Sequence, residues 1–261
     1  MQLKDKVILI TGSTTGIGAA MARLFVSEGA RVILHGREEE KGRELRKELG
    51  ASTTLHLHDL ADPLSPERLV AAALQDFGRL DALVNNAALT TRTDLVTTDA
   101  AMFDRMIGVN LRAPLLLIRA ALEPLAATQG VVLNIGSVLA HCGQTNLLAY
   151  SITKGGLMTM TRNLADALGP RRVRVNQLNL GWTLTENEYA VKLSDGMPPD
   201  WPEHLPVTSA PSGKLLTPED IARCALYWVG DYSRPISGTV AEIEQYPVIG
   251  RFTNHDTLKH E

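Results

Sequence analysis

A short apolar run that turns directly into a glycine-rich segment constrains this chain more than any other feature. Residues 6–11, KVILIT, have the length and composition of a buried strand. The segment GSTTGIG follows at 12–18, and AAMARLFVSEG after it has helical periodicity with a stop at Gly29. Strand, glycine turn and helix in this order predict the first unit of a fold in which strands and helices alternate around a parallel sheet.

Glycines at three positions of this turn suit a phosphate-binding loop. Gly12 permits a tight turn, Gly16 lets the backbone approach a pyrophosphate, and Gly18 lets the helix pack against the strand. Backbone amides at the start of the helix would then face the phosphates. The expected binding residues are Gly12, Thr14, Thr15, Gly16, Ile17 and Gly18. The alternative is a plain strand-to-helix turn that binds nothing.

The end of the second predicted strand, residues 31–35, bears on which dinucleotide would bind. An acidic residue there commonly takes the ribose 2′-hydroxyl of NAD, whereas a nearby arginine accommodates the 2′-phosphate of NADP. The chain reads His35-Gly36-Arg37, with no carboxylate at the turn. Because a guanidinium is planar and binds phosphate through two hydrogen bonds, we favour NADP over NAD. A solvated Arg37 with loose selectivity is the alternative.

The following segments continue the alternation of strands and helices. Helical patterns and strand patterns occupy residues 38–49, 53–58, 66–77 and 80–84 in the order helix, strand, helix, strand. This order predicts a doubly wound parallel sheet, which binds ligands at the carboxyl ends of its strands. Asp59, Asn85 and Asn86 fall at such ends, either as part of a site or as ordinary turn and cap residues.

Asn110 stands inside a long predicted helix over residues 100–125. A buried polar side chain in an apolar helix needs hydrogen-bond partners. Pro114, four residues on, predicts a kink or local break that frees a carbonyl, and the pair could hold a water. Alternatively, Asn110 faces solvent.

Three polar residues in the second half of the chain suggest acid/base chemistry. Residues 131–137, VVLNIGS, read as a buried strand that ends at Ser137. Tyr150 and Lys154 would lie one turn apart on the same face of a helix. An ammonium beside a phenol favours the phenolate, and so lets a tyrosine, which titrates near ~10 when free, exchange protons at neutral pH. The spacing YxxxK alone more often marks an ordinary surface helix.

Composition excludes several classes of protein. Hydrophobic residues make up 44% and charged residues 21% of the 261 residues, as in an ordinary globular chain. A net charge of -3 and an aromatic content of 5% give no basis for binding nucleic acid or an anionic membrane surface. No stretch approaches the ~20 apolar residues of a membrane span, and no pattern predicts a metal site. With two cysteines and no signal-like segment, we expect a cytoplasmic protein.

Together these motifs resemble the short-chain dehydrogenase/reductases (SDRs), in their single-domain branch. The matching segments, in the order and spacing of that family, are TGSTTGIG at 11–18, NNAA at 85–88, Asn110, Ser137, and Tyr150 with Lys154. The resemblance covers roughly residues 3–244. It implies one Rossmann-fold domain over 1–261, built on a doubly wound seven-stranded parallel sheet with helices on both faces. It also implies a small-molecule substrate and a homotetramer or homodimer.

The resemblance assigns roles to individual residues. Tyr150 would be the general acid/base, Lys154 would lower its pKa and hold the nicotinamide ribose, and Ser137 would bond the substrate oxygen. Asn110, through a bound water, would link Lys154 to a proton relay. Residues expected to contact other parts of the cofactor are Arg37, Asp59, Leu60, Asn86, Ala87, Ala88, Gly181, Thr183 and Thr185. For Thr185, a helix N-cap is an equal alternative.

Three departures from the family pattern leave these catalytic groups in place. Ala88 stands where the family usually has glycine. Leu180 precedes Gly181 where a proline is usual, which leaves the geometry of the turn beside the nicotinamide open. Residues 242–246, EIEQY, replace an Asp-Gly-Gly, so the path of the tail at 245–261 is also open.

Residues 182–214 are expected to form a substrate lid. Prolines at 198, 199, 202, 206 and 211 leave little room for regular structure over 186–214, and long irregular loops in compact domains are commonly functional. Trp182, Met197 and Trp201 could close over a substrate. Plain disorder is the alternative.

The expected substrate-binding residues are Ser137, His141, Gln144, Tyr150 and Trp182. Amide and imidazole groups before Tyr150 suit a hydroxyl-rich substrate, so we expect a sugar, polyol or hydroxy acid, with a purely structural His141 as the alternative. The whole pattern predicts an NAD(P)-dependent oxidoreductase that interconverts a secondary alcohol and a ketone. A catalytically silent dinucleotide-binding sensor or scaffold is the competing interpretation.

Overall fold

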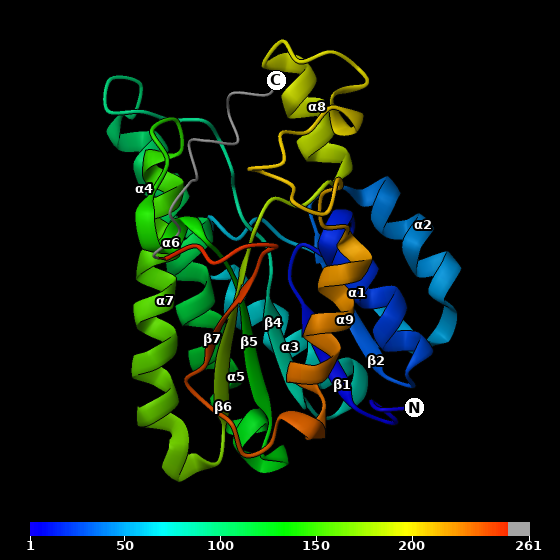
Figure 1. Cartoon of the computed structure of the whole chain (residues 1–261). Helices are drawn as coiled ribbons and strands as arrows, with labels where there is room; N and C mark the ends of the chain where they lie inside the picture. Colours follow the sequence, from blue (N-terminus) through cyan, green and yellow to red (C-terminus); the bar gives the residue numbers. More distant parts are fainter. Residues whose placement is uncertain (250–261) are drawn as a thin grey trace.

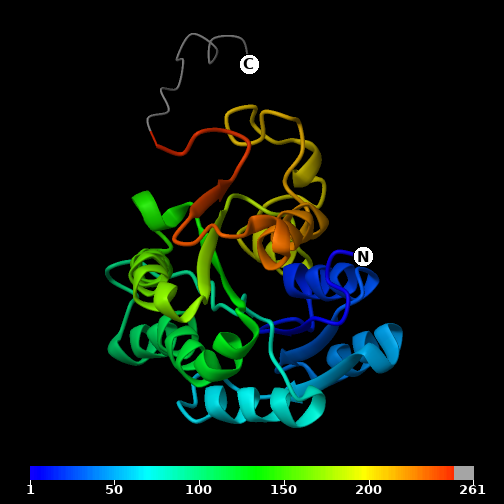
Figure 2. The same ribbon diagram turned by 90° about the horizontal axis from the view of Figure 1, so that it is seen from below.

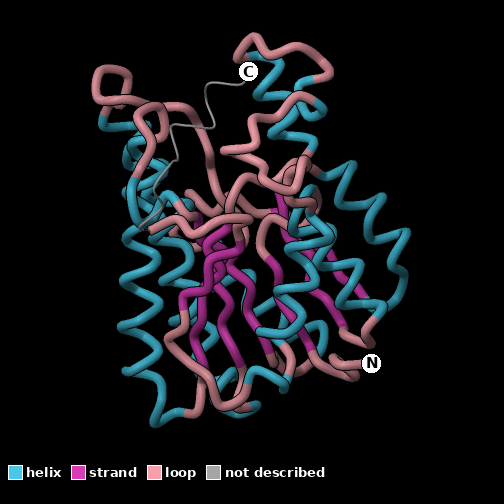
Figure 3. Tube along the Cα trace, in the orientation of Figure 1, coloured by secondary structure: helices cyan, strands magenta, loops and turns pink. Residues whose placement is uncertain are grey.

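A parallel seven-stranded sheet in the order β3-β2-β1-β4-β5-β6-β7 forms the centre of the molecule (Figures 1 and 3). The structure is a computed structural model, and it describes residues 1–249. The strands are β1 (Val7–Ile10), β2 (Arg31–Gly36), β3 (Thr53–Leu57), β4 (Ala82–Asn85), β5 (Val131–Ser137), β6 (Arg174–Leu180) and β7 (Val240–Ile243). This arrangement confirms the predicted doubly wound Rossmann sheet.

Helices cover both faces of the sheet (Figure 2). They are α1 (Gly16–Ser27), α2 (Glu39–Leu49), α3 (Ser65–Phe77), α4 (Ala100–Ile107), α5 (Ala113–Thr128), α6 (Leu139–Cys142), α7 (Leu148–Leu168), α8 (Glu186–Ser194) and α9 (Pro218–Val229). Alternate strand residues divide the core, with Ile8 and Ile10 packed toward α1 and α9, and Val7 and Leu9 toward α3 and α5. Within residues 1–249, none of these helices combines the length and apolar character that crossing a bilayer requires.

The strand order reverses at β1, which pairs with β2 on one side and β4 on the other. Loops that leave the carboxyl ends of strands diverge at such a point, and ligands bind between them. The glycine turn after β1 and the Asn86 segment after β4 both open there. Ser137 ends β5 at the same edge, and α8 lies above that edge (Figure 1).

The lid segment contradicts the expectation of an irregular chain over 186–214. Helix α8 spans Glu186–Ser194, and a short 3₁₀ turn spans Trp201–Glu203. Thr185 caps α8 by accepting a hydrogen bond from the Glu188 amide, and acidic residues in the first turn suit the helix dipole. The prolines begin only at residue 198, beyond the helix, so they do not oppose it. The expectations for the tail beyond residue 249 lie outside the described residues.

The long helix expected over 100–125 contains the local break that Pro114 predicts. A π-helical segment, Gly108–Arg112, separates α4 from α5, and the Ala113 amide donates to the Gly108 carbonyl five residues back. Pro114 has no N–H to offer the carbonyl of Asn110, four residues before it. The break therefore falls on Asn110.

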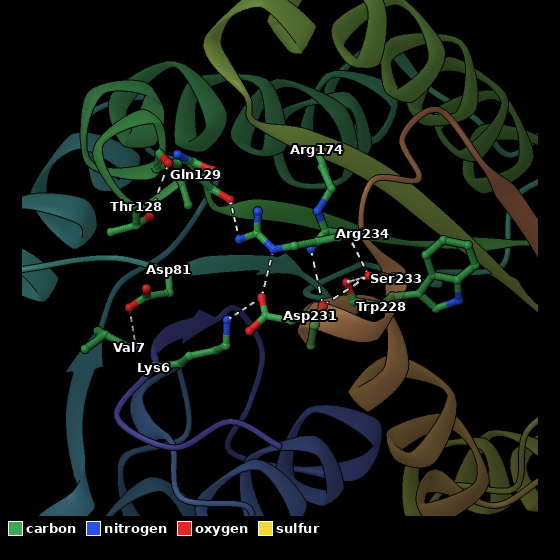
Figure 4. A network of polar contacts seen from close by, with 12 residues as sticks. Lys6, Val7, Asp81, Thr128, Gln129, Arg174, Trp228, Asp231, Ser233 and Arg234 are labelled. Atoms are coloured by element: carbon green, nitrogen blue, oxygen red, sulfur yellow. Dashed lines mark hydrogen bonds and ion pairs between the residues drawn. The ribbon is translucent and has the colours of Figure 1, made fainter. Parts of the chain in front are cut away.

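A polar network lies at the amino-terminal ends of the strands, where β6 begins (Figure 4). Arg174 Nη1 donates to Ser233 Oγ at 2.7 Å, and Lys6 Nζ pairs with Asp231 Oδ1 at 2.9 Å. Burial lowers the pKa of Arg174 to about 10, which leaves it charged at neutral pH. This network holds the amino-terminal edge of the sheet together, away from the carboxyl ends where ligands bind.

Candidate active site

The turn after β1 has the geometry that close approach of a phosphate requires. Gly12 and Gly16 have φ angles of 63° and 52°, which favour glycine. A Cβ atom on Gly12 would lie 2.9 Å from the Ala87 Cα, and one on Gly18 would overlap the Gly12 carbonyl oxygen. The roles predicted for Gly12 and Gly18, a tight turn and close packing, are therefore confirmed.

The first turn of α1 offers backbone amides to an anion. Thr15 occupies the N-cap position, but its side chain makes no capping hydrogen bond in this 12-residue helix. The first N–H groups of a helix have no partner within the helix, and they carry a partial positive charge. The residues present thus fit a dinucleotide pyrophosphate. Direct contact by Thr14, Thr15, Gly16 and Ile17 remains a prediction.

Asn86 holds the glycine turn in place. Its Nδ2 donates to the carbonyl oxygens of Thr11 at 2.9 Å and Gly12 at 3.0 Å. In return, Thr11 Oγ1 accepts from the amides of Asn86 and Ala87. The segment after β4 and the turn after β1 therefore form one hydrogen-bonded unit. Cofactor contacts by Asn86, Ala87 and the half-buried Ala88 remain predictions.

His35, which stood out in the sequence only as a position without a carboxylate, is buried beneath the glycine turn. Its Nδ1 accepts from the Gly12 amide at 3.2 Å, and its Nε2 lies 3.1 Å from the His58 carbonyl oxygen. A neutral ring with its proton on Nε2 satisfies both contacts. Burial lowers the pKa of His35 to about 4 and so keeps this ring neutral.

Arg37 is exposed directly after β2 and forms no ion pair with any residue in the described part of the chain. Its positive charge contributes, with larger effects from other groups, to lowering the pKa of Asp59. The side chain of Thr14 packs against Gly36, where any added Cβ would collide with it. Arg37 is thus free to meet a ligand at the end of β2.

Asp59 and Leu60 follow β3 and have different environments. Asp59 accepts from the Ala61 amide at 2.9 Å and from Arg105 Nη2 at 3.0 Å. The bond from Ala61 has the largest effect in lowering the pKa of Asp59, so this side chain is ionised at neutral pH. Leu60 is buried in the core. Their placement beside an adenine remains a prediction.

Ser137, Tyr150 and Lys154 come together at the carboxyl end of β5. Ser137 is the last residue of β5, and its hydroxyl lies near enough to the phenol of Tyr150 on α7 to lower the pKa of that phenol. Lys154 is buried one turn further along α7, with its Nζ 2.7 Å from the Ile135 carbonyl oxygen. The ammonium lies 5.4 Å from the centroid of the Tyr150 ring. The structure thus brings the three residues into the arrangement that the sequence predicts.

In the chain by itself, burial has the largest effect on the pKa of Tyr150, and the lowering of this pKa by Lys154 remains a prediction. Burial raises the pKa of Tyr150 to about 12, against the smaller lowering effect of the Ser137 hydroxyl. Burial also lowers the pKa of Lys154 to about 8. Both groups lose hydration, and the ammonium is directed at a backbone carbonyl. The phenol is therefore protonated at neutral pH.

Asn110 is buried at the π-helical break with its side chain fully bonded. Its Oδ1 accepts from the Leu89 amide at 2.8 Å, and its Nδ2 donates to the Leu89 carbonyl at 2.9 Å and to Thr153 Oγ1 at 3.1 Å. Thr153 in turn donates to the Tyr150 carbonyl. Asn110 thus fastens α7 beside the catalytic tyrosine. Its link to Lys154 through a water remains a prediction.

Glu244 contacts the turn after β6, where the proline usual in the family is replaced by Leu180. Glu244, just beyond β7, accepts from the Trp182 amide at 3.1 Å. Any Cβ on Gly181 would collide with the Glu244 carboxylate. The two departures from the family pattern, before Gly181 and after β7, therefore meet in one contact. Thr185 accepts from the Glu188 amide as the N-cap of α8, and its hydroxyl proton remains available for a ligand.

The lid has a small hydrophobic core of its own. Trp201 is buried in it with Ala210 and Leu215, while Met197 packs at its margin. Trp182 stacks on Trp201, with centroids 5.5 Å apart and planes 9° apart. The expectation that Trp201 closes over a substrate is therefore wrong, because its ring is buried within the lid and has no surface left to contact a substrate. Trp182 remains at the site, half-buried.

His141 and Gln144 do not converge on Tyr150. His141 Nε2 lies 3.1 Å from Glu242 Oε1 and 3.2 Å from Asn179 Nδ2, which favours a structural histidine. Gln144 donates to Asn146 and lines an open hollow whose lining does not include Tyr150. Direct substrate contact by either residue remains a prediction.

A chain of polar side chains, most of them buried and absent from the sequence predictions, connects β4, β5 and β6. Each member hydrogen-bonds the next in the order Asn85, Asn134, Thr161, Gln177, Asn179 and His141. Gly136 makes room for it, because a Cβ there would collide with Gln177 and Asn179. These hydrogen bonds cross-link the strands that lead to Asn86 and Ser137.

Comparison with known proteins agrees with this geometry. Residues 12–245 match the family described as enoyl-(acyl carrier protein) reductase. The L-fucose dehydrogenase of Mus musculus is 35% identical over 225 residues, which cover 85% of this chain and 81% of that protein. The trans-4-hydroxycyclohexanecarboxylate dehydrogenase of Sinomonas cyclohexanicum is 29% identical, covering 98% of this chain and 97% of that protein.

The fold of this chain is also similar to that of a solved reductase structure. A 3-ketoacyl-(acyl-carrier-protein) reductase from Brucella melitensis, complexed with NADH, aligns with a TM-score of 0.81 and 29% sequence identity. The alignment covers 92% of this chain and 97% of that one. With the glycine turn and the Ser137–Tyr150–Lys154 arrangement, these matches show that the chain belongs to the short-chain dehydrogenase/reductase family, as an NAD(P)-dependent oxidoreductase of CH–OH and keto groups.

Proposed function

We propose that this protein interconverts a secondary alcohol and the matching ketone on a small hydroxyl-rich substrate, namely a sugar, polyol or hydroxy acid. The convergence of Ser137, Tyr150 and the buried Lys154 at the carboxyl end of β5 carries this proposal. A silent sensor would have no use for these three groups together. The names of two relatives, L-fucose dehydrogenase and trans-4-hydroxycyclohexanecarboxylate dehydrogenase, support a hydroxylated substrate.

In this mechanism Ser137 holds the substrate oxygen and Tyr150 exchanges a proton with it. When bound, the nicotinamide supplies or accepts the hydride and in its oxidised form adds a positive charge beside the site. Because the pKa of Tyr150 is raised to about 12, the phenol is ready at neutral pH to donate its proton to a ketone oxygen. Oxidation of an alcohol needs the phenolate instead. Lys154 keeps a positive charge behind the phenol up to its pKa of about 8.

For the cofactor we infer a preference for NADP over NAD. Arg37 is exposed at the end of β2, and no carboxylate in residues 1–249 pairs with it. It can therefore meet a 2′-phosphate without first breaking an ion pair.

The direct test is a panel of ketones and polyols with each reduced and oxidised nicotinamide, followed by absorbance. We expect reduction to hold its rate across neutral pH and oxidation to rise with pH, since only oxidation needs the deprotonated phenol. Tyr150→Phe should lower turnover by about 10²-fold or more, the usual contribution of a positioned acid, while cofactor binding survives. Wild-type rates in that variant would refute the assignment of Tyr150. Cofactor binding without turnover of any substrate would favour the sensor instead.

We also propose a homotetramer or homodimer in the cytoplasm. Leu115 on α5 and Ile152 on α7 are exposed apolar side chains that could take part in contacts between subunits. The unpaired thiols of Cys142 and Cys224 suit a reducing compartment. Light scattering that reports a monomer at micromolar concentration would refute the assembly.

A further inference from the structure

Glu188 places a carboxylate at the substrate end of the catalytic site. In the sheet, Leu180 of β6 pairs with Ser137 of β5, so Trp182 lies two residues beyond the partner of the catalytic serine. The Trp182 indole N–H donates to Glu188 Oε1 at 2.8 Å. The side chain of Glu188 is therefore tied to the turn beside Ser137, although it comes from α8.

The charge of Glu188 is not neutralised by a cation among residues 1–249, unlike that of its acidic neighbours in the lid. Asp195 pairs with Arg92 at 3.0 Å, and Glu186 lies 3.8 Å from Lys41. Lys192, one turn beyond Glu188, instead lies 5.2 Å from the Trp182 ring centroid and 3.9 Å from Asp195. Of these three carboxylates, Glu188 is therefore the one that no cation pairs with.

The field of Glu188 reaches the catalytic tyrosine. Among the described residues, Glu188 is the charged side chain whose field raises the pKa of Tyr150, in addition to the larger effect of burial. This effect agrees with the placement of Glu188 by the Trp182 hydrogen bond, close to the strand end that carries Ser137.

Resting on the proposed function, we propose that Glu188 contacts the substrate and selects its class. Glu188 accepts a hydrogen bond from a hydroxyl group next to the reacting carbon, so that neutral polyols, sugars and hydroxyketones are taken and carboxylates are rejected. Trp182 is a positioning residue, because its indole N–H bonds one carboxylate oxygen of Glu188 and leaves the other oxygen of Glu188 for the substrate. Of the three substrate kinds in the proposed function, this excludes hydroxy acids.

The selectivity follows from charge and hydrogen bonding. A hydrogen bond to an ionised acceptor is about twice as strong as a neutral one, and a substrate without the donor leaves the carboxylate without its partner. A substrate carboxylate in the same place meets a like charge. Hydroxyacetone, acetone and pyruvate differ only in the group beside the ketone, so they separate the two effects.

The experiment measures kcat/KM for these three ketones with the wild type, Glu188→Gln and Glu188→Ala. We expect the wild type to favour hydroxyacetone over acetone, and acetone over pyruvate. Glu188→Gln keeps a hydrogen-bond acceptor but removes the charge, so the ratio of pyruvate to hydroxyacetone should rise roughly tenfold. Glu188→Ala should also lose the preference for hydroxyacetone over acetone. Glu186→Gln, which removes the same charge from the exposed start of α8, is the matched control and should change neither ratio.

A second readout separates substrate contact from a merely structural role in the lid. Removing the negative charge of Glu188 lowers the pKa of Tyr150, so the alkaline limit of ketone reduction should move to lower pH in Glu188→Gln and not in Glu186→Gln. Cofactor affinity, measured by fluorescence, should stay unchanged in both variants. Turnover with unchanged ratios, or a wild type that prefers pyruvate, would overturn the role of Glu188 alone. Absence of turnover with every ketone and both cofactors would overturn the proposed function itself.

Discussion

At the scale of single residues, burial sets the charge of the groups around the site. Tyr150 and His35 are both neutral at neutral pH, because desolvation raises the pKa of the phenol and lowers that of the imidazole. The phenol can then act as an acid, and the imidazole can accept the Gly12 amide. The neutral phenol makes the reaction depend on pH, and the neutral imidazole makes the stability of the fold depend on pH.

His35 should make the protein sensitive to acid. Its pKa is 6.5 in an unfolded chain and about 4 in the folded one, so between these values the unfolded state binds more protons. Stability due to His35 is complete above the unfolded value and is lost as pH falls toward about 4, to a total of about 3 kcal/mol. In urea unfolding between pH 7 and 4.5, His35→Gln should therefore show a smaller loss of stability than the wild type. His204→Gln, at an exposed site in the lid, is the control, and equal slopes in all three proteins would contradict the prediction.

Arg37 should carry the discrimination between the two cofactors. Its guanidinium is expected to bond a 2′-phosphate, and a hydrogen bond to a charged group contributes about 1.5–3 kcal/mol. Arg37→Gln should therefore weaken NADPH binding by roughly 10–100-fold and leave NADH affinity almost unchanged. Fluorescence titration measures both, with Arg43→Gln as control, because Arg43 lies on the exposed face of α2 beside Glu39. Equal affinities of the wild type for NADPH and NADH would defeat the preference.

At the scale of secondary structure, the helix starts differ in what satisfies their amides. Thr185 caps α8, and Thr217 with Asp220 forms a capping box on α9. The start of α1 has no side-chain cap. Those free amides are what the glycine turn presents to an anion, so the turn cannot tolerate changes that move α1 away from β1.

Gly18→Ala should disrupt this element selectively. The new Cβ would overlap the Gly12 carbonyl oxygen, so α1 must shift from the turn, and we expect a stability loss of about 1–3 kcal/mol together with a large loss of dinucleotide affinity. Gly169→Ala is the matched control, because its φ is -52° and no atom lies near its added Cβ. Calorimetry and cofactor titration would report both effects. Unchanged cofactor affinity in Gly18→Ala would contradict the role of the close packing.

At the scale of the whole molecule, the sheet has a core on each face, and the lid has a third, separate cluster. The polar contacts between the lid and the body include the ion pairs of Arg92 with Asp195 and of Lys41 with Glu186, and the hydrogen bonds of Ser212 to Gln245, all of them exposed. Exposed ion pairs contribute little to stability. The lid should therefore be able to unfold locally while the sheet remains intact.

Trp201→Ala tests this independence. Removing a buried tryptophan costs about 3–5 kcal/mol, which should exceed the local stability of the lid. Hydrogen exchange and limited proteolysis should show residues 186–214 losing protection while the sheet keeps its unfolding midpoint. In the control, Trp228→Ala, the ring removed packs against the main core, so the global midpoint should fall. A global loss of stability in Trp201→Ala would show that the lid and sheet form one cooperative unit.

Local patterns in the chain were sufficient for the Rossmann sheet, the glycine turn, the break at Asn110 and the Ser137–Tyr150–Lys154 set. Each depends on interactions between near neighbours in sequence, namely strand and helix periodicity, positive φ at glycine, a proline without an N–H, and i, i+4 spacing. The sequence prediction did not include helix α8, because it applied the effect of the prolines from residue 198 onward to the whole of 186–214. The segment before Pro198 contains no proline and begins with a good N-cap at Thr185.

The remaining features depend on residues far apart in sequence that folding brings together. His35 lies beneath Gly12, Glu244 supports the turn at Trp182, and Glu188 reaches the indole of that same residue. Burial then raises the pKa of Tyr150, and the nearby Lys154 ammonium is directed at a backbone carbonyl. Sequence spacing establishes which groups share a helix face or a strand end. Hydration and long-range contacts, which exist only in the folded chain, establish their charge, their partners and the substrate that they would accept.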